Sequence, residues 1–147
     1  MSNHHLLIVA NETIEGTALI EAVRDIALSN DADVLVVAPA LNSRLRHWMS
    51  DSDGAHRAAD QRLAGCLARL REAGVRAAGH VGDADPIRAI EDALRAFPAD
   101  EIVIGTHPED RSNWLARDLV GRTCAVYGLP VVHVVVDLAT RREYLAA

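Results

Sequence analysis

A polar segment with anion-binding chemistry follows an apolar run in the last third of the chain. Thr106–Asn113 comes directly after Glu101–Gly105 and leads into a helical pattern. An arginine can hold a phosphate or carboxylate through two parallel hydrogen bonds. A helix N-terminus adds backbone N–H groups and the positive end of a dipole. The pattern therefore predicts an anion site, formed by Gly105, Thr106, His107, Arg111, Ser112 and Asn113.

Some of these residues also have an ordinary structural interpretation. Ser112 or Asn113 could cap the helix that begins there, because short polar side chains accept hydrogen bonds from the first-turn N–H groups. Arg111 could pair with Glu109 or Asp110. Both alternatives stay open at the level of sequence.

Apolar runs and helical patterns alternate along the chain, and this alternation predicts the elements that position the segment. The expected strands are His5–Ala10, Asp33–Pro39, Val75–Val81, Glu101–Gly105 and Val131–Asp137. The expected helices cover about 16–29, 55–73, 86–97 and 112–127. Right-handed crossovers then give one three-layer, doubly wound α/β domain over residues 1–147. Its sheet is five-stranded and mainly parallel, with helices on both faces.

Ligands of such sheets bind outside the carboxyl ends of the strands, near the point where the strand order reverses. These ends carry small or polar residues here. Together with the segment after Glu101–Gly105, they predict a rim that includes Ala10, Asn11, Pro39, Val81 and Gly82.

The chain resembles the universal stress protein family from Leu6 to Val136. The resemblance is carried by the order of the elements, the segment GDADPIRAIEDAL, the strand end VIGTH and the closing GLPVVHVV. It implies an adenine nucleotide alpha hydrolase-like fold, ATP or another adenine nucleotide as ligand, and a role in stress response or signalling. It also implies dimerisation through the last strand, and places Val81 and Gly82 near the base.

The sequence departs from the pattern of ATP-binding members of that family. Gly105 matches the first glycine of their loop, but the second falls on Pro108, and the closing glycine and hydroxyl residue fall on Asp118-Leu119. Asn11 stands where those members have an aspartate at the end of the first strand. The alternative function is therefore a ligand-free dimeric interaction scaffold that has lost ATP binding.

A homodimer is also expected from the last strand itself. It is apolar at nearly every position, and an open edge of that kind invites pairing with a second chain. The predicted interface residues are Val132, Val134 and Val136.

Composition excludes several other functions. A formal charge of -6 argues against a nucleic-acid or anionic-membrane surface. The seven histidines show no metal-ligand spacing, so no metal is expected. Without a nucleophile motif we assign no catalytic residue, and without a lysine the chain does not fit a response-regulator receiver. The two cysteines and the lack of a signal-peptide pattern predict free thiols and a cytoplasmic protein.

Overall fold

The computed structural model describes residues 4–10, 17–39, 52–82, 85–106, 119–137 and 142–145. Strands and helices alternate along the described residues from His4 to Asp137, as the sequence predicts, and one further strand follows. The strands are β1 (His4–Val9), β2 (Ala32–Pro39), β3 (Arg76–Gly82), β4 (Glu101–Thr106), β5 (Val131–Asp137) and β6 (Arg142–Leu145). The helices are α1 (Thr17–Asn30), α3 (Ser52–Glu72), α4 (Pro86–Ala96) and α6 (Leu119–Tyr127).

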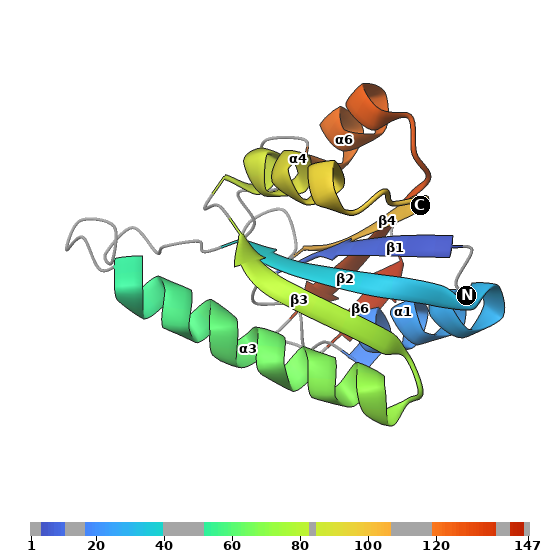
Figure 1. The fold of residues 1–147 in the computed structure, drawn as a ribbon, viewed down its shortest axis with the longest axis horizontal. Coiled ribbons are helices and arrows are strands. Elements are labelled where there is room, and N and C mark those ends of the chain that lie inside the picture. Colours follow the sequence, from blue (N-terminus) through green and yellow to red (C-terminus); the bar gives the residue numbers. More distant parts are fainter. Residues whose placement is uncertain are drawn as a thin grey trace.

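The strands form one sheet in the order β3-β2-β1-β4-β5-β6. The first five in this order are parallel to one another. In Figure 1, α4 and α6 lie on one side of the sheet and α1 and α3 on the other. The predicted α/β fold, with a five-stranded parallel sheet between two helical layers, is therefore confirmed.

Strand β1 shows why the strands are apolar at consecutive positions. Leu6 and Ile8 belong to the core under α1 and α3, whereas Leu7 and Val9 belong to the core under α4. All four side chains are at most 1% exposed. Successive side chains of a strand point to opposite faces, so a central strand covered on both faces has no place for a polar residue.

Two helix ends are fixed by the residues that the sequence singles out. Gly74, at φ +88°, lies just beyond α3. The Gly74 N–H donates to the Arg71 carbonyl, and the Val75 N–H donates to the Leu70 carbonyl. This pair of hydrogen bonds is the Schellman motif, which ends a helix. At the start of α4, the Asp85 carboxylate accepts from the Ile87 N–H at 3.0 Å and Pro86 follows at the first helical position. No helix in the described part of the chain is long and apolar enough to cross a membrane.

The prediction of an open edge along the last long strand is wrong. The chain adds β6, which pairs antiparallel with β5 from Val134↔Leu145 to Asp137↔Arg142. Val134 is 0% exposed inside the chain's own core and Val132 is only partly buried against it. From Val134 onward, the backbone edge that was expected to meet a second chain is thus occupied by Arg142–Leu145 of the same chain. The side chain of Val136 lies outside the described residues.

Cys66 is a buried free thiol in the core under α1 and α3. This agrees with the expected free thiols for the one cysteine whose side chain is described.

Candidate functional site

The strand order reverses between β1 and β4. The chain passes from β1 to β2 and β3 on one side of the sheet, and then crosses back so that β4 pairs with β1 on its other side. Helices α1 and α3 cover one face during the first half, and α4 and α6 cover the other face during the second. In open α/β sheets this switch point, at the carboxyl ends of the strands, is the usual place for a ligand.

The two strands at the switch point separate at their carboxyl ends. Their pairing stops at Val9↔Ile104. One residue later, the Ala10 N–H donates to the Val37 carbonyl of β2 at 3.2 Å. Strand β4 instead continues along β5 through Gly105↔Val134 and Thr106↔Val135. The backbone therefore diverges between Ala10 and Gly105, two of the residues that the sequence predicts for the site.

Small residues occupy this point of divergence. Ala10 is 0% exposed, and Gly105 is buried and has no side chain. Neither residue places bulk between the separating strands. Backbone N–H and carbonyl groups at such a position can serve a ligand, because they are obligatory hydrogen-bonding groups.

The ends of β2 and β3 form the neighbouring part of the rim. Pro39 and Gly82 are in register, with Pro39 buried and Gly82 half-buried. Val81 packs partly against the core under α1 and α3. The structure thus brings the predicted residues Ala10, Pro39, Val81, Gly82, Gly105 and Thr106 to one edge of the sheet.

Gly82 has a packing role that the sequence does not reveal. A Cβ at this position would lie 2.8 Å from Val37 Cγ1 and 3.1 Å from Ala89 Cβ. Strand β3 can end against α4 only because residue 82 has no side chain. The sequence predicts Gly82 as a ligand contact from its place at a strand end, but spacing alone cannot show its neighbours in β2 and α4.

The remaining predicted site residues cannot be placed. Asn11, His107, Arg111, Ser112 and Asn113 lie outside the described residues, as does the predicted helix start at Ser112. Thr106 is placed as the last residue of β4, without a description of its side chain. The roles of these side chains stay predictions.

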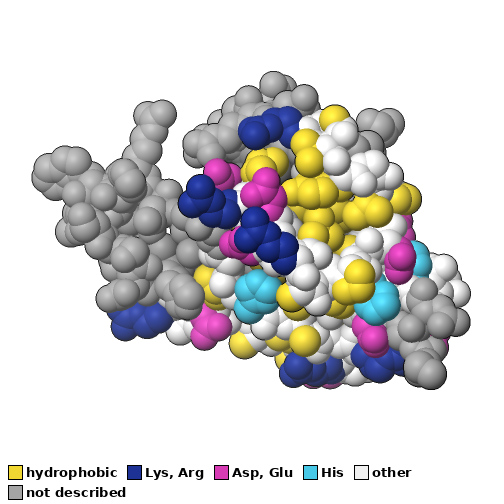
Figure 2. All heavy atoms as spheres, turned by 45° about the horizontal axis from the view of Figure 1, so that its top comes forward, with side chains coloured by type: hydrophobic (Ala, Val, Ile, Leu, Met, Phe, Trp, Pro, Cys, Tyr) yellow, Lys and Arg dark blue, Asp and Glu magenta, His cyan; other side chains and the backbone are white. Residues whose placement is uncertain are grey.

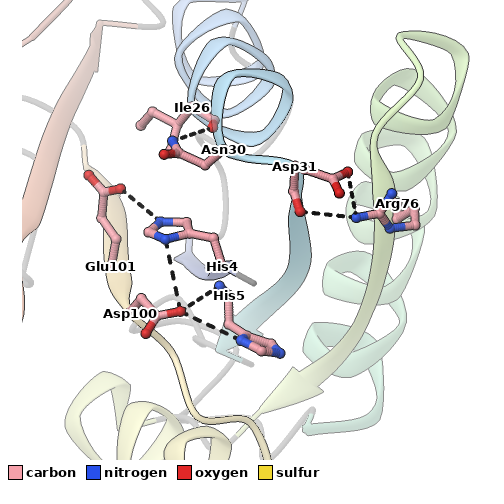
Figure 3. A network of polar contacts seen from close by, with 8 residues as sticks. All are labelled: His4, His5, Ile26, Asn30, Asp31, Arg76, Asp100 and Glu101. Carbon is pink, nitrogen blue, oxygen red and sulfur yellow. Dashed lines mark hydrogen bonds and ion pairs between the residues drawn. The ribbon is translucent and has the colours of Figure 1, made fainter. Parts of the chain in front are cut away.

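A second polar cluster lies at the opposite edge of the sheet, where the strands begin (Figure 3). The Asp100 carboxylate accepts from the His5 N–H at 2.8 Å, and the Asp100 N–H donates to the His5 carbonyl at 2.8 Å. The same carboxylate lies 3.5 Å from His5 Nδ1 and 3.9 Å from His4 Nδ1, while His4 Nε2 lies 3.5 Å from Glu101 Oε2. This cluster joins the start of β1 to the start of β4.

The cluster at the strand starts is not a metal centre. Over the residues that the structure describes, no group of three or more histidine, cysteine or carboxylate side chains could hold a metal ion. Arg76 belongs to the same edge and donates to Asp33 Oδ1 at 2.6 Å and Asp31 Oδ1 at 3.0 Å. These hydrogen bonds raise the pKa of Arg76, and the bond to Asp33 contributes most. The edge is held by polar contacts between neighbouring strands.

Two hydroxyl groups on α6 are buried, although the sequence does not mark them. Thr123 is 0% exposed, and neither its Oγ1 nor the Tyr127 hydroxyl has a hydrogen-bond partner among the described residues. Burial raises the pKa of Tyr127, with a further contribution from the Glu91 carboxylate. The four-residue spacing puts both side chains on one face of the helix, but no sequence signal distinguishes them from core residues.

Strand β5 carries His133, and burial lowers the pKa of this side chain. Its neighbours Val132 and Val134 pack on the α1 side, so His133 projects to the α6 side of the sheet. Figure 2 views the face that carries α4 and α6, where hydrophobic side chains gather between charged ones. Val126 of α6 is 69% exposed.

Comparison with known proteins relates this geometry to a family. The model of the universal stress protein family matches residues 2–126. No curated protein is a significant match to the sequence.

Solved structures of universal stress proteins share the fold. A protein of this family from Burkholderia pseudomallei superposes with a TM-score of 0.63 at 16% identity, over 88% of this chain and 93% of its own. The Archaeoglobus fulgidus protein in complex with dAMP superposes with a TM-score of 0.62 at 18% identity, and the match covers 90% of this chain and 98% of that protein. An Arabidopsis thaliana protein with AMP bound superposes with a TM-score of 0.59 at 15% identity, and the match covers 92% of this chain and 94% of that protein. At such identities the likeness is one of fold.

Proposed function

Since the chain belongs to the universal stress protein family, we propose that it binds an adenine nucleotide at the carboxyl ends of β1 and β4. The observation that carries the proposal is the separation of these strands. Ala10 bonds to β2 while Gly105 and Thr106 stay with β5, and both flanking positions have little or no side chain. Among the similar structures, the Archaeoglobus fulgidus protein is in complex with dAMP and the Arabidopsis thaliana protein has AMP bound.

The two parts of a nucleotide would meet different parts of the rim. In our proposal the backbone of Val81 and Gly82 and the side chain of Asn11 face the base. The phosphate is met by the segment after β4, through Thr106, His107, Arg111 and the N–H groups near Ser112 and Asn113.

We expect a monophosphate to bind at least as tightly as ATP. Pro108 has no N–H to offer a phosphate, and Asp118 places a negative charge where ATP-binding relatives have glycine. Each additional phosphate adds negative charge without the glycine backbone that would receive it. The formal net charge of the chain is -6, so the protein as a whole does not attract an anion and does not offset this repulsion.

Calorimetric titration with AMP and ATP tests the proposal. We expect saturable one-to-one binding of AMP. Arg111→Gln should weaken AMP about tenfold or more, because a hydrogen bond to a charged group contributes about 1.5–3 kcal/mol. The matched control is Arg95→Gln, which removes an exposed arginine from the last turn of α4. The first turn of this helix follows the rim residue Gly82, so Arg95 lies at the helix end that is farther from the rim.

Comparison with adenosine separates the base from the phosphate. Arg111→Gln should leave adenosine binding unchanged if the arginine meets the phosphate. An equal loss for AMP and adenosine would place Arg111 elsewhere. Absence of binding by AMP, ATP and cyclic AMP would favour the ligand-free scaffold as the function of this fold.

The cellular role is proposed to be stress response or signalling in the cytoplasm. A cytoplasmic pool that rises in abundance under starvation or oxidative stress would support it. Constant abundance under all such conditions would argue against a stress role, independently of whether the nucleotide binds.

A further inference from the structure

Strand β3 forms the edge of the sheet opposite to β6. It pairs with β2 in an unbroken register from Asp33↔Arg76 to Pro39↔Gly82. Natural sheets protect an edge with short strands, proline, bulges or charged residues. Strand β3 has seven residues and no proline, and its one arginine, Arg76, bonds to Asp33 of β2. The strand itself therefore offers little protection against the addition of a further strand.

The Arg71 side chain identifies the backbone groups of β3 that point outward. Its Nε and Nη2 donate to the Ala77 carbonyl at 3.1 and 2.9 Å, so this carbonyl points away from β2. Successive residues of a strand direct their backbone groups to opposite sides. The N–H and carbonyl groups of Gly79 and Val81 therefore point outward as well. In the described part of the chain no strand pairs with them.

Helix α3 runs along β3 and forms a wall beside this edge (Figure 1). Arg71 reaches the outward carbonyl from α3, so the helix face that carries Arg71 borders the edge. Leu67 and Ala64 share that face, because residues three or four apart are neighbours on a helix. Leu67 is partly buried against the core and Ala64 is exposed. The wall is thus apolar, with the positive charge of Arg71 at its end.

Arg71 has donors to spare for a carboxylate. A guanidinium group carries five N–H donors. Over the described residues, the two hydrogen bonds of Arg71 both go to the neutral Ala77 carbonyl, and the side chain is exposed. Arg76, at the start of the same strand, instead bonds to the carboxylates of Asp33 and Asp31. An exposed arginine with unused donors beside a strand edge favours a partner that carries an acidic side chain.

We propose that β3 and α3 together bind an extended segment of a partner protein, which adds to β3 as an antiparallel strand. The backbone of this segment pairs with Gly79 and Val81. Its residues on the α3 side are apolar and contact Leu67, and the residue opposite Ala77 is acidic and pairs with Arg71. Strand addition of this kind takes its affinity from main-chain hydrogen bonds and its specificity from alternate side chains.

A synthetic peptide tests the proposal on the full chain. The probe is Val-Thr-Val-Thr-Asp with acetylated and amidated ends, which places its aspartate opposite Ala77 when its first valine is opposite Val81. Titration of the ¹⁵N-labelled protein should give saturable shifts of the Ala77, Gly79 and Val81 N–H signals at millimolar peptide. Shifts centred on β5 and β6, or no shifts, would overturn the proposal.

Methylated probes test the backbone ladder. Residues directly opposite each other lie on the same face of a sheet, so the two valines direct their N–H groups at β3 and the threonines direct theirs away. N-methylation of both valines should abolish binding, whereas N-methylation of both threonines should leave it unchanged. An equal loss for the two probes would show that the peptide does not add to the sheet.

Paired substitutions test the role of Arg71. Arg71→Gln, or asparagine in place of the aspartate of the probe, should weaken binding about threefold or more, because each removes one charge of an exposed ion pair. The two changes together should cost no more than either alone. The matched control is Arg57→Gln, an exposed arginine near the start of α3, which should leave the affinity unchanged. Equal or tighter binding by Arg71→Gln would show that Arg71 guards the edge, and would overturn the proposed pairing.

Discussion

Replacement of Gly82 by alanine separates packing from ligand contact at the rim. The new Cβ would lie 2.8 Å from Val37 Cγ1 and 3.1 Å from Ala89 Cβ, both closer than ordinary contact. Val37 is 0% and Ala89 1% exposed, and both belong to the core under α4. Overpacking of a filled core costs about 1–3 kcal/mol.

A smaller effect acts in the opposite direction. Alanine restricts the unfolded chain more than glycine does, which stabilises a protein by about 0.4–1 kcal/mol. The steric cost is the larger of the two. We therefore expect Gly82→Ala to lower the free energy of unfolding by about 1–2 kcal/mol, measured by urea denaturation followed by circular dichroism.

A double-mutant cycle with Val37→Ala identifies the atom responsible. Removal of Val37 Cγ1 takes away the closest contact, so Gly82→Ala should cost less in that background, with a coupling of about 0.5 kcal/mol or more. Gly74→Ala is a useful comparison, because nothing lies within 4 Å of its Cβ and only its φ of +88° opposes a side chain. A neutral or stabilising Gly82→Ala, with no coupling to Val37→Ala, would refute the packing role.

Further predictions concern buried polar groups on α6 and β5. Thr123→Val and Tyr127→Phe should each leave the free energy of unfolding unchanged or raise it by about 1 kcal/mol, because each hydroxyl is buried without a partner among the described residues. A loss above about 1 kcal/mol in urea denaturation would show that the hydroxyl is bonded. Burial lowers the pKa of His133 below its ordinary 6.5, so below pH 6.5 the unfolded chain binds more protons. Stability should fall as the pH drops through this range and level off below the folded pKa. His133→Gln should reduce that fall, and an identical pH profile for both proteins would contradict the shift.

The fold follows from features that act within a few residues or along one strand. The runs of β1 and β4 are apolar on both faces because both faces are covered, so they are recognisable in the sequence. Gly74 and Asp85-Pro86 mark helix ends through backbone preferences that act locally. The alternation of these elements then leaves few possible topologies.

Strand β6 could not be predicted in the same way. Its four residues, REYL, have two charges and no apolar alternation, so only the neighbouring β5 edge makes them a strand. The prediction of an open β5 edge was wrong for this reason. Pairing of an edge strand depends on what else in the chain can reach it, and short strands leave no pattern.

The place of the candidate residues in the sheet could be predicted from the sequence, whereas their roles in binding stay predictions. Parallel strands that alternate with helices place all their carboxyl ends at one edge, so Ala10, Gly82 and Gly105 come together as expected. The contact of Gly82 with Val37 and Ala89 arises between three elements and has no counterpart in spacing. The phosphate-facing side chains of Arg111 and its neighbours lie outside the described residues and stay predictions.

Amide chemical-shift mapping with AMP tests the central claim most directly. Titration of the ¹⁵N-labelled protein should shift the N–H signals of Ala10, Gly82, Gly105 and Thr106 at the carboxyl ends of the strands. Signals of His5 and Asp100, at the opposite edge of the sheet, should not move. Saturable shifts confined to the first group are the predicted result. Shifts centred on the His5–Asp100 edge, or no shifts at all at millimolar AMP, would contradict nucleotide binding at the separation of β1 and β4.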